Sequence, residues 1–216
     1  MQRLNCREQD RTTWADAGFD GPPVMWRRAR SALRRSSRFS ASKWRVLLGQ
    51  TIARCVMQRK QSERAWGQHR AEAAQLMQSG QEDRVDEQVI LCLREKARLA
   101  AFIVVQDYCE QVIDKLPLIE QEESKECPEE VREAVASLLF TASMCKDFVE
   151  LEKMKLLFEA KFGSPFVASV IDNLRGVGSQ IIELLSNQTP SWPVRAKYMA
   201  EIAKEFDIKW GPTRDH

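Results

Sequence analysis

The residues that could do chemistry in this chain are few, and they do not gather into a catalytic pattern. Only two histidines occur, His69 and the terminal His216, and the cysteines at 55, 92 and 109 have no histidine nearby in the sequence that could activate a thiol. There is no phosphate-binding loop, dinucleotide fingerprint, nucleophile elbow or zinc-protease motif. No two of the six cysteines are separated by two residues, so neither a zinc knuckle nor a redox motif is indicated. We therefore expect no enzyme, no metal and no cofactor.

Carboxylates are densest between Glu120 and Glu130. We interpret this run as a solvated loop, because a calcium loop needs regularly spaced Asp, Asn and Gly that are absent here. A helical enzyme that uses Glu122 and Glu123 is a weaker alternative, and the sequence indicates no reaction for it.

Positive charge is the stronger functional signal. Residues 1–70 contain 16 Lys+Arg against 5 Asp+Glu, whereas residues 71–216 contain 17 against 26. The formal net charge of +2 therefore hides a strongly basic first part and an acidic remainder. This distribution is typical of a chain that contacts something anionic or stacks on copies of itself.

The first 42 residues are predicted to form a disordered basic arm. Its arginines are interleaved with serines and aromatic residues, and they are Arg27, Arg28, Arg30, Arg34, Arg35 and Arg38. A solvated arm, a contact for anionic lipid or nucleic acid, and a transit peptide all fit this composition. Four acids upstream of the arginines disfavour the transit peptide. A nucleic-acid-associated helical protein acting through residues 27–45 is thus the alternative function.

A second basic group follows on a long predicted helix, off its apolar stripe. Its members are Lys43, Arg45, Arg54, Arg59, Lys60, Arg64 and Arg70. A solvated helical face would mix charge signs to gain stabilising pairs, but Glu63 is the only acid that offsets these residues. We expect the face to contact either anionic lipid or the acidic half of a neighbouring copy, and the second contact would produce a polymer.

The elements that position these residues are all predicted to be helices. No proline occurs from Val24 to Leu116, and apolar residues recur every three or four positions over 43–78 and 82–116. A glycine at position 80 ends the first helix, and the short turn forces an antiparallel hairpin. Shorter helices are expected from Pro128, from a capping box at Asp147–Glu150, from Ser164-Pro165, around 181–185, and from about Pro193 to Phe206. No strand pattern and no apolar run long enough to span a membrane is present.

Several segments resemble the increased-sodium-tolerance family of ESCRT-III-like proteins. The run from Glu126 to Phe140 is similar to the third-helix signature of that family, and Phe158–Val167 is similar to its lysine–aromatic–glycine turn. Further similarity lies in Ile181–Ser186, in Ala200–Phe206 with Trp210, and in the second helix at 94–95 and 108–110. The stretch Asp86–Ile90 departs from the arginine-containing pattern that the family usually has there.

The resemblance implies an all-α ESCRT-III-like core at 43–210, with a long helical hairpin, shorter helices packed on it, and a tail at 211–216. It also implies a cytoplasmic protein, peripheral on endosomal membranes, that regulates ESCRT-III assembly in multivesicular-body sorting. The expected partners are the C-terminal helical tails of ESCRT-III subunits, received in a groove beside the hairpin, and an anionic membrane. The family also modulates the AAA ATPase of this pathway, but its docking helix is not found before His216, so we do not expect docking through it.

Overall fold

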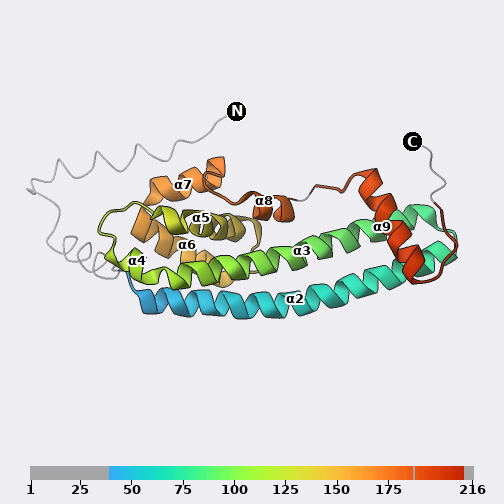
Figure 1. Cartoon of the computed structure of the whole chain (residues 1–216), viewed down its shortest axis with the longest axis horizontal. Helices are drawn as coiled ribbons and strands as arrows, with labels where there is room; N and C mark the ends of the chain where they lie inside the picture. Colours follow the sequence, from blue (N-terminus) through green and yellow to red (C-terminus); the bar gives the residue numbers. More distant parts are fainter. Residues whose placement is uncertain (1–38, 187, 212–216) are drawn as a thin grey trace, which may run out of the picture. The chain divides into compact units, whose positions relative to one another are not determined.

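Two long antiparallel helices form the frame of the protein. The structure is a computed structural model that describes residues 39–186 and 188–211. Helix α2 (Ala41–Gln78) and helix α3 (Glu82–Asp114) run side by side (Figure 1). At 1.5 Å per residue, the 38 residues of α2 extend about 57 Å. The predicted hairpin is confirmed.

The turn of the hairpin follows from one glycine. Gly80 has φ +69°, a conformation that a side chain disfavours, and the amide of Gln81 donates to the carbonyl of Leu76 at 3.1 Å. The Gly80 amide donates to the carbonyl of Met77 at 3.2 Å. Together these bonds satisfy the last carbonyls of α2 in a Schellman motif, which fixes where the chain reverses.

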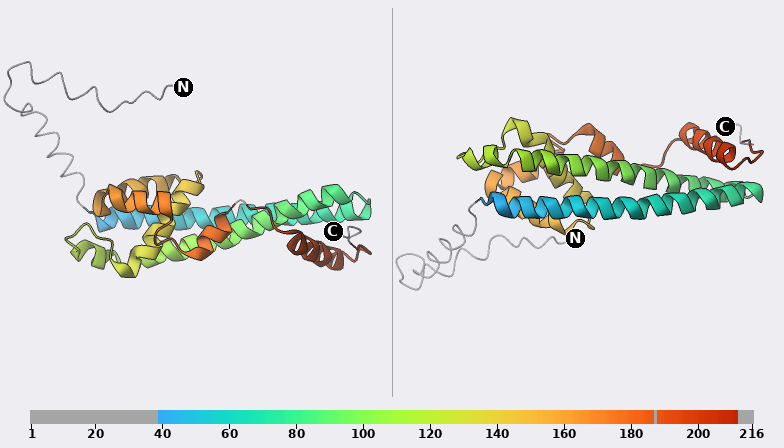
Figure 2. Two further views of the ribbon diagram at one scale, coloured as in Figure 1. Left: turned by 90° about the horizontal axis from the view of Figure 1, so that it is seen from above. Right: turned by 60° about the horizontal axis from the view of Figure 1, so that its bottom comes forward.

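Six shorter helices follow in the described part of the chain. They are α4 (Leu116–Gln121), α5 (Glu129–Met144), α6 (Val149–Phe162), α7 (Ser164–Asn173), α8 (Ser179–Leu185) and α9 (Trp192–Glu205). Figures 1 and 2 show α5, α6 and α7 gathered beside the start of α2, and α9 crossing the hairpin near its turn. No strand occurs in these residues, so the all-α class is confirmed.

The buried side chains form two separate cores. The larger one joins the first part of α2 and the last part of α3 to helices α4–α8. Within it, the rings of Trp44 and Phe158 meet edge to face, with 5.0 Å between their centroids. The smaller one lies at the turn and joins residues 73–92 of the hairpin to Tyr198, Met199 and Ile202 of α9. Below, we refer to these regions as the packed end and the turn end.

Three local expectations about where helices begin and end were wrong. Helix α3 ends at Asp114 rather than near residue 116, and an unforeseen helix α4 contains Pro117 in its first turn. The capping box at Asp147–Glu150 does not form, because Phe148 is the N-cap of α6 and makes no side-chain capping bond. The Glu150 side chain instead reaches across to α2.

Candidate interaction surfaces

Two of the predicted basic residues on α2 are partly buried and paired with acids of shorter helices. Arg54 donates to both carboxylate oxygens of Glu150 on α6, from Nε and Nη2 at 2.6 Å each. These donated hydrogen bonds hold the pKa of Glu150 below its ordinary value, against the opposing effect of burial. Arg70 lies 4.5 Å over the ring of Trp66 and forms an ion pair with Glu205 of α9. Both arginines therefore hold a shorter helix on α2.

The other predicted cations of α2 remain available at the surface. Lys43, Arg45, Lys60 and Arg64 are exposed, and Arg59 is half-buried. None of the five has an ion pair within residues 39–186 and 188–211. The arginines of the predicted arm, from Arg27 to Arg38, lie outside the described residues. The expected basic surface is thus reduced to these five side chains where the structure describes it.

One groove runs beside α3, between the C-terminal end of α5 and the C-terminal end of α8 with the segment that follows it. It has a volume of about 620 Å³. Leu91, Ala97, Met144 and Leu184 contribute apolar surface, and the cations and acids around them are Arg94, Arg98, Lys146, Glu95, Asp147 and Glu183. An apolar floor with charges of both signs at its edge suits the apolar face of an amphipathic helix.

Tight packing around Gly178 fixes the start of α8, the helix whose C-terminal end lines this groove. The amide of Gly178 donates to Ser137 Oγ at 3.0 Å, and Tyr108 Oη donates to Glu133 Oε1 at 2.9 Å. A Cβ at position 178 would lie 2.2 Å from Tyr108 Oη, so only glycine fits without a shift. This close approach seats α8 against α3 and α5, and no motif in the sequence indicated it.

Polar contacts set the position of α9 beyond the groove. Arg195 Nε donates to Asp86 Oδ1 at 2.7 Å, and Arg195 also donates to the carbonyl of Pro190 at 2.5 Å. Trp66 Nε1 donates to Tyr198 Oη at 2.6 Å. Asp86 belongs to the stretch that departs from the family pattern, and its pairing with α9 gives that stretch a structural role here.

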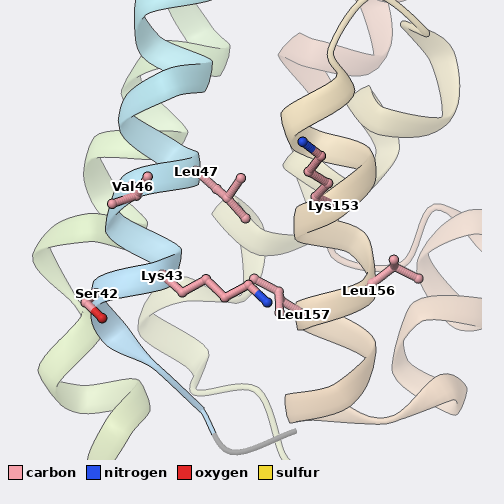
Figure 3. A pocket seen from close by; sticks show the side chains of 7 residues that line it. All are labelled: Ser42, Lys43, Val46, Leu47, Lys153, Leu156 and Leu157. Carbon is pink, nitrogen blue, oxygen red and sulfur yellow. The ribbon is translucent and has the colours of Figure 1, made fainter. Parts of the chain in front are cut away.

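A second groove lies between α2 and α6, with a volume of about 470 Å³. Figure 3 shows Leu47 directed from α2 toward α6 and Lys43 extended across the gap toward Leu157. Lys153 and Leu156 line its other side, with Leu156 pointing away from α2. No acidic residue lines this groove.

The groups that an enzyme would need are poorly placed in the described residues. Burial raises the pKa of the Cys55 thiol to about 12, that of Cys92 to about 11 and that of Cys127 to about 12, so these thiols are protonated at neutral pH. The Ser124 amide and hydroxyl hold the pKa of Glu122 below its ordinary value, so this carboxyl is a poor proton donor. His69 Nδ1 lies 2.9 Å from Gln88 Oε1.

The part of the chain that the structure describes also offers no metal site and no membrane span. It contains no group of three or more His, Cys, Asp or Glu side chains that could hold a metal ion. None of its helices combines the length and the apolar character that crossing a bilayer requires.

Comparison with known proteins identifies the family. The family model described as "Ist1: Regulator of Vps4 activity in the MVB pathway" matches residues 45–209. The chain belongs to the Ist1 family. The resemblance seen in the sequence is therefore confirmed, and the family association with protein transport and vacuolar sorting in the multivesicular-body pathway applies to it at that level.

Two relatives describe the match further. The vacuolar protein sorting-associated protein IST1 of Saccharomyces cerevisiae is 26% identical over 149 residues, which cover 66% of this chain and 50% of that protein. The chain thus spans about half the length of this curated relative. The solved N-terminal domain of S. cerevisiae Ist1, in complex with a Did2 MIM motif, matches with a TM-score of 0.74 at 22% identity. The match covers 82% of this chain and 97% of that domain, and at this identity it shows the fold alone.

Proposed function

We propose that this Ist1-family chain regulates ESCRT-III assembly and disassembly by binding subunit tails, without catalysis of its own. The groove beside α3 is the observation that carries the proposal, because its apolar floor and mixed-charge edge suit an amphipathic helix. A Did2 MIM motif bound to the N-terminal domain of yeast Ist1 supports this choice of partner. Bound to such tails on endosomal membranes, the chain would modulate the ATPase that disassembles the filament.

The exposed cations of α2 have a second part in this proposal. Lys43, Arg45, Lys60 and Arg64 point to an anionic neighbour, either lipid or the acidic half of another ESCRT-III-like subunit. Membrane contact of this kind would bring the regulator to the surface where the filament assembles.

Fluorescence anisotropy of labelled C-terminal tail peptides from the ESCRT-III subunits tests the tail contact. We expect selective micromolar binding to the full chain, with a scrambled tail as the control, since a groove of this size buries only a few anchor side chains. Met144→Glu places a charge in the groove and should weaken binding at least about tenfold, because a buried carboxylate needs a partner.

Ile103→Glu is the matched control for this variant. Ile103 is 43% exposed on α3, close to the 46% of Met144, and it does not line the groove. Its substitution should leave tail binding unchanged. Flat responses across all tails, or equal losses for both variants, would contradict the proposal.

A further inference from the structure

The segment that connects α8 to α9 presents a threonine directly before a proline. Thr189 is exposed, and its hydroxyl has no hydrogen bond within residues 39–186 and 188–211. Residues 188–191 contain no helix, and Figure 1 shows them as an extended link between the two helices. A residue that precedes proline favours this extended conformation. Thr189 therefore offers a free hydroxyl on an accessible, extended backbone.

Ser164 is the other residue of this kind, because a Ser or Thr precedes proline at only two places in the sequence. Ser164 is the first residue of α7, and its Oγ donates to Glu159 Oε1 at 2.6 Å. Its hydroxyl is thus engaged, and its backbone belongs to a helix. Both side chains are exposed, but only Thr189 combines a free hydroxyl with an extended backbone in the part of the chain that the structure describes.

Arg195 joins the segment before α9 to the hairpin. Its Nε donates to Asp86 Oδ1 of α3 at 2.7 Å, and its Nη1 donates to the carbonyl of Pro190 at 2.5 Å. The side chains of Arg195 and Asp86 are 18% and 27% exposed, so their ion pair is partly shielded from water. One guanidinium therefore ties the start of α9 to α3, and it lies at the residue that follows Thr189.

We propose that Thr189 is a phosphorylation site for a proline-directed protein kinase, and that its phosphate releases α9 from Asp86. In the transfer, Thr189 Oγ1 attacks the γ-phosphorus of ATP, the bond from that phosphorus to the β,γ-bridging oxygen breaks, and ADP leaves. The hydroxyl proton passes to a carboxylate of the kinase. The proline after Thr189 suits such an enzyme, because it has no amide N–H that the kinase would need to satisfy.

The phosphate competes with Asp86 for Arg195. A phosphothreonine carries about −1.5 to −2 charges at neutral pH, and a guanidinium binds it through paired, charge-assisted hydrogen bonds. Arg195 already binds the carbonyl of the next residue, so a turn of its side chain brings the guanidinium to the phosphate. The phosphate also repels the Asp86 carboxylate. Helix α9 thereby loses its ion pair with α3, and its remaining polar contacts with α2 lie over the small core at the turn end.

This inference goes beyond the proposed function, because it concerns α9 and does not depend on tail binding. Phosphorylation of the full chain by a purified cyclin-dependent kinase with ATP and Mg²⁺ tests the site. Mass spectrometry should find the phosphate on Thr189, and Thr189→Ala should prevent its addition. Ser164→Ala is the matched control and should leave the modification unchanged. The proposal is overturned by an unmodified Thr189, or by equal modification of Ser164.

Hydrogen exchange of the phosphorylated chain tests the release of α9. Exchange in α9 should become about three- to fivefold faster, since a partly exposed ion pair contributes a factor of roughly this size. Exchange at the packed end should stay the same. Asp86→Asn removes the ion pair in advance, so phosphorylation should not speed exchange in α9 any further in this variant.

Glu87→Gln is the matched control for the aspartate. Glu87 is an exposed neighbour on α3 that has no ion pair in the described residues, and its substitution removes the same charge. Phosphorylation should speed exchange in α9 of this variant as much as in the wild type.

Two results of the exchange measurement would overturn the release of α9. Unchanged or slower exchange after phosphorylation would mean that the phosphate holds α9 in place. An equal increase in the wild type and in Asp86→Asn would mean that the phosphate acts away from Arg195. None of these measurements uses a subunit tail, so their failure is distinguishable from failure of the proposed function.

Discussion

The two ends of the hairpin are held together in different ways. At the packed end, helices α4–α8 cover the hairpin with a large apolar core that includes Trp44, Phe148 and Phe158. At the turn end, α9 and the segment after it, with Ile208 and Trp210, cover the hairpin over a core of fewer side chains. The same hairpin therefore has a large buried core at the packed end and a small one at the turn end.

Polar contacts supplement the smaller core at the turn end. Trp66 and Tyr198 share a hydrogen bond, Arg195 pairs with Asp86, and the ammonium of Lys96 lies 5.6 Å over the Tyr198 ring. Such contacts contribute about 0.5–1 kcal/mol each at partly exposed sites. We therefore expect α9 to open locally at a lower free energy than the packed end, in the way that separate cooperative units of a fold do.

Replacing one leucine of α2 with alanine at each end gives the largest expected difference in the free energy of unfolding. Leu48 is fully buried at the packed end and Leu76 is 6% exposed at the turn end, both on α2. We expect Leu48→Ala to lower the free energy of unfolding by about 3–5 kcal/mol, because a well-packed core relaxes little around a cavity. Leu76→Ala should cost about 2 kcal/mol, because a small core can collapse onto the space.

Urea denaturation of both variants measures the loss in the free energy of unfolding. Hydrogen exchange shows which helices are destabilised. Leu76→Ala should speed exchange mainly in α9 and beside the turn, whereas Leu48→Ala should speed it throughout. Equal costs with the same exchange pattern would show that the hairpin unfolds as one unit.

The next largest change in stability is expected at Gly178, the glycine that precedes α8. Gly178→Ala places a methyl group 2.2 Å from Tyr108 Oη and should destabilise the protein by about 1–3 kcal/mol through overpacking. Gly49→Ala is the matched control, because Gly49 is a glycine within α2 with nothing within 4 Å of its added Cβ. That change should stabilise the protein by about 0.5–1 kcal/mol. Thermal unfolding of both variants measures these changes. If Gly178→Ala does not alter the stability, the Tyr108 side chain moves aside without cost and the prediction is wrong.

Features set by local sequence were the ones that could be predicted. The hairpin turn depends on Gly80 and the start of α5 on Pro128, and the chemistry of each residue is enough to place the boundary. The short helix α4 was missed because Pro117 was interpreted only as the end of the preceding helix. A proline is also accepted in the first turn of a new helix, and this is its position in α4. At the hairpin turn and at the start of α5, local signals are therefore enough to place the boundary.

The candidate surfaces could be predicted only in part, because they depend on contacts between residues that are distant in the sequence. The cations of α2 were found from their types, but nothing local to Arg54 shows that Glu150, 96 residues away, binds it. Likewise the groove beside α3 is formed by side chains from α3, from the end of α5 and from α8 with the segment after it, which only tertiary packing brings together. Which basic residue is free and which is structural depends on contacts distant in sequence.

A smaller effect is expected from one hydroxyl at the turn end. Tyr198→Phe removes the acceptor of the Trp66 indole N–H and leaves the ring beneath Lys96. The cost should be about 1 kcal/mol, because a partly buried donor loses its partner. Hydrogen exchange should show faster opening of α9 with no change at the packed end. An effect spread over both ends would contradict the separation between them.

The smallest expected effect is the pH dependence of the Arg54–Glu150 pair, which links α6 to α2 at the packed end. Because hydrogen bonds from Arg54 lower the pKa of Glu150 in the folded state, the carboxylate stabilises the fold above its ordinary pKa of 4.5. This contribution is lost as the pH falls below 4.5 and through the lower folded pKa. Glu150→Gln should therefore be less stable than wild type at neutral pH, and the difference should shrink in acid. Glu152→Gln, an exposed neighbour without an ion pair in the described structure, is the control and should leave the stability at neutral pH unchanged. A difference for Glu150→Gln that stays constant with pH would mean that packing of α6, and not this charge pair, sets its position on α2.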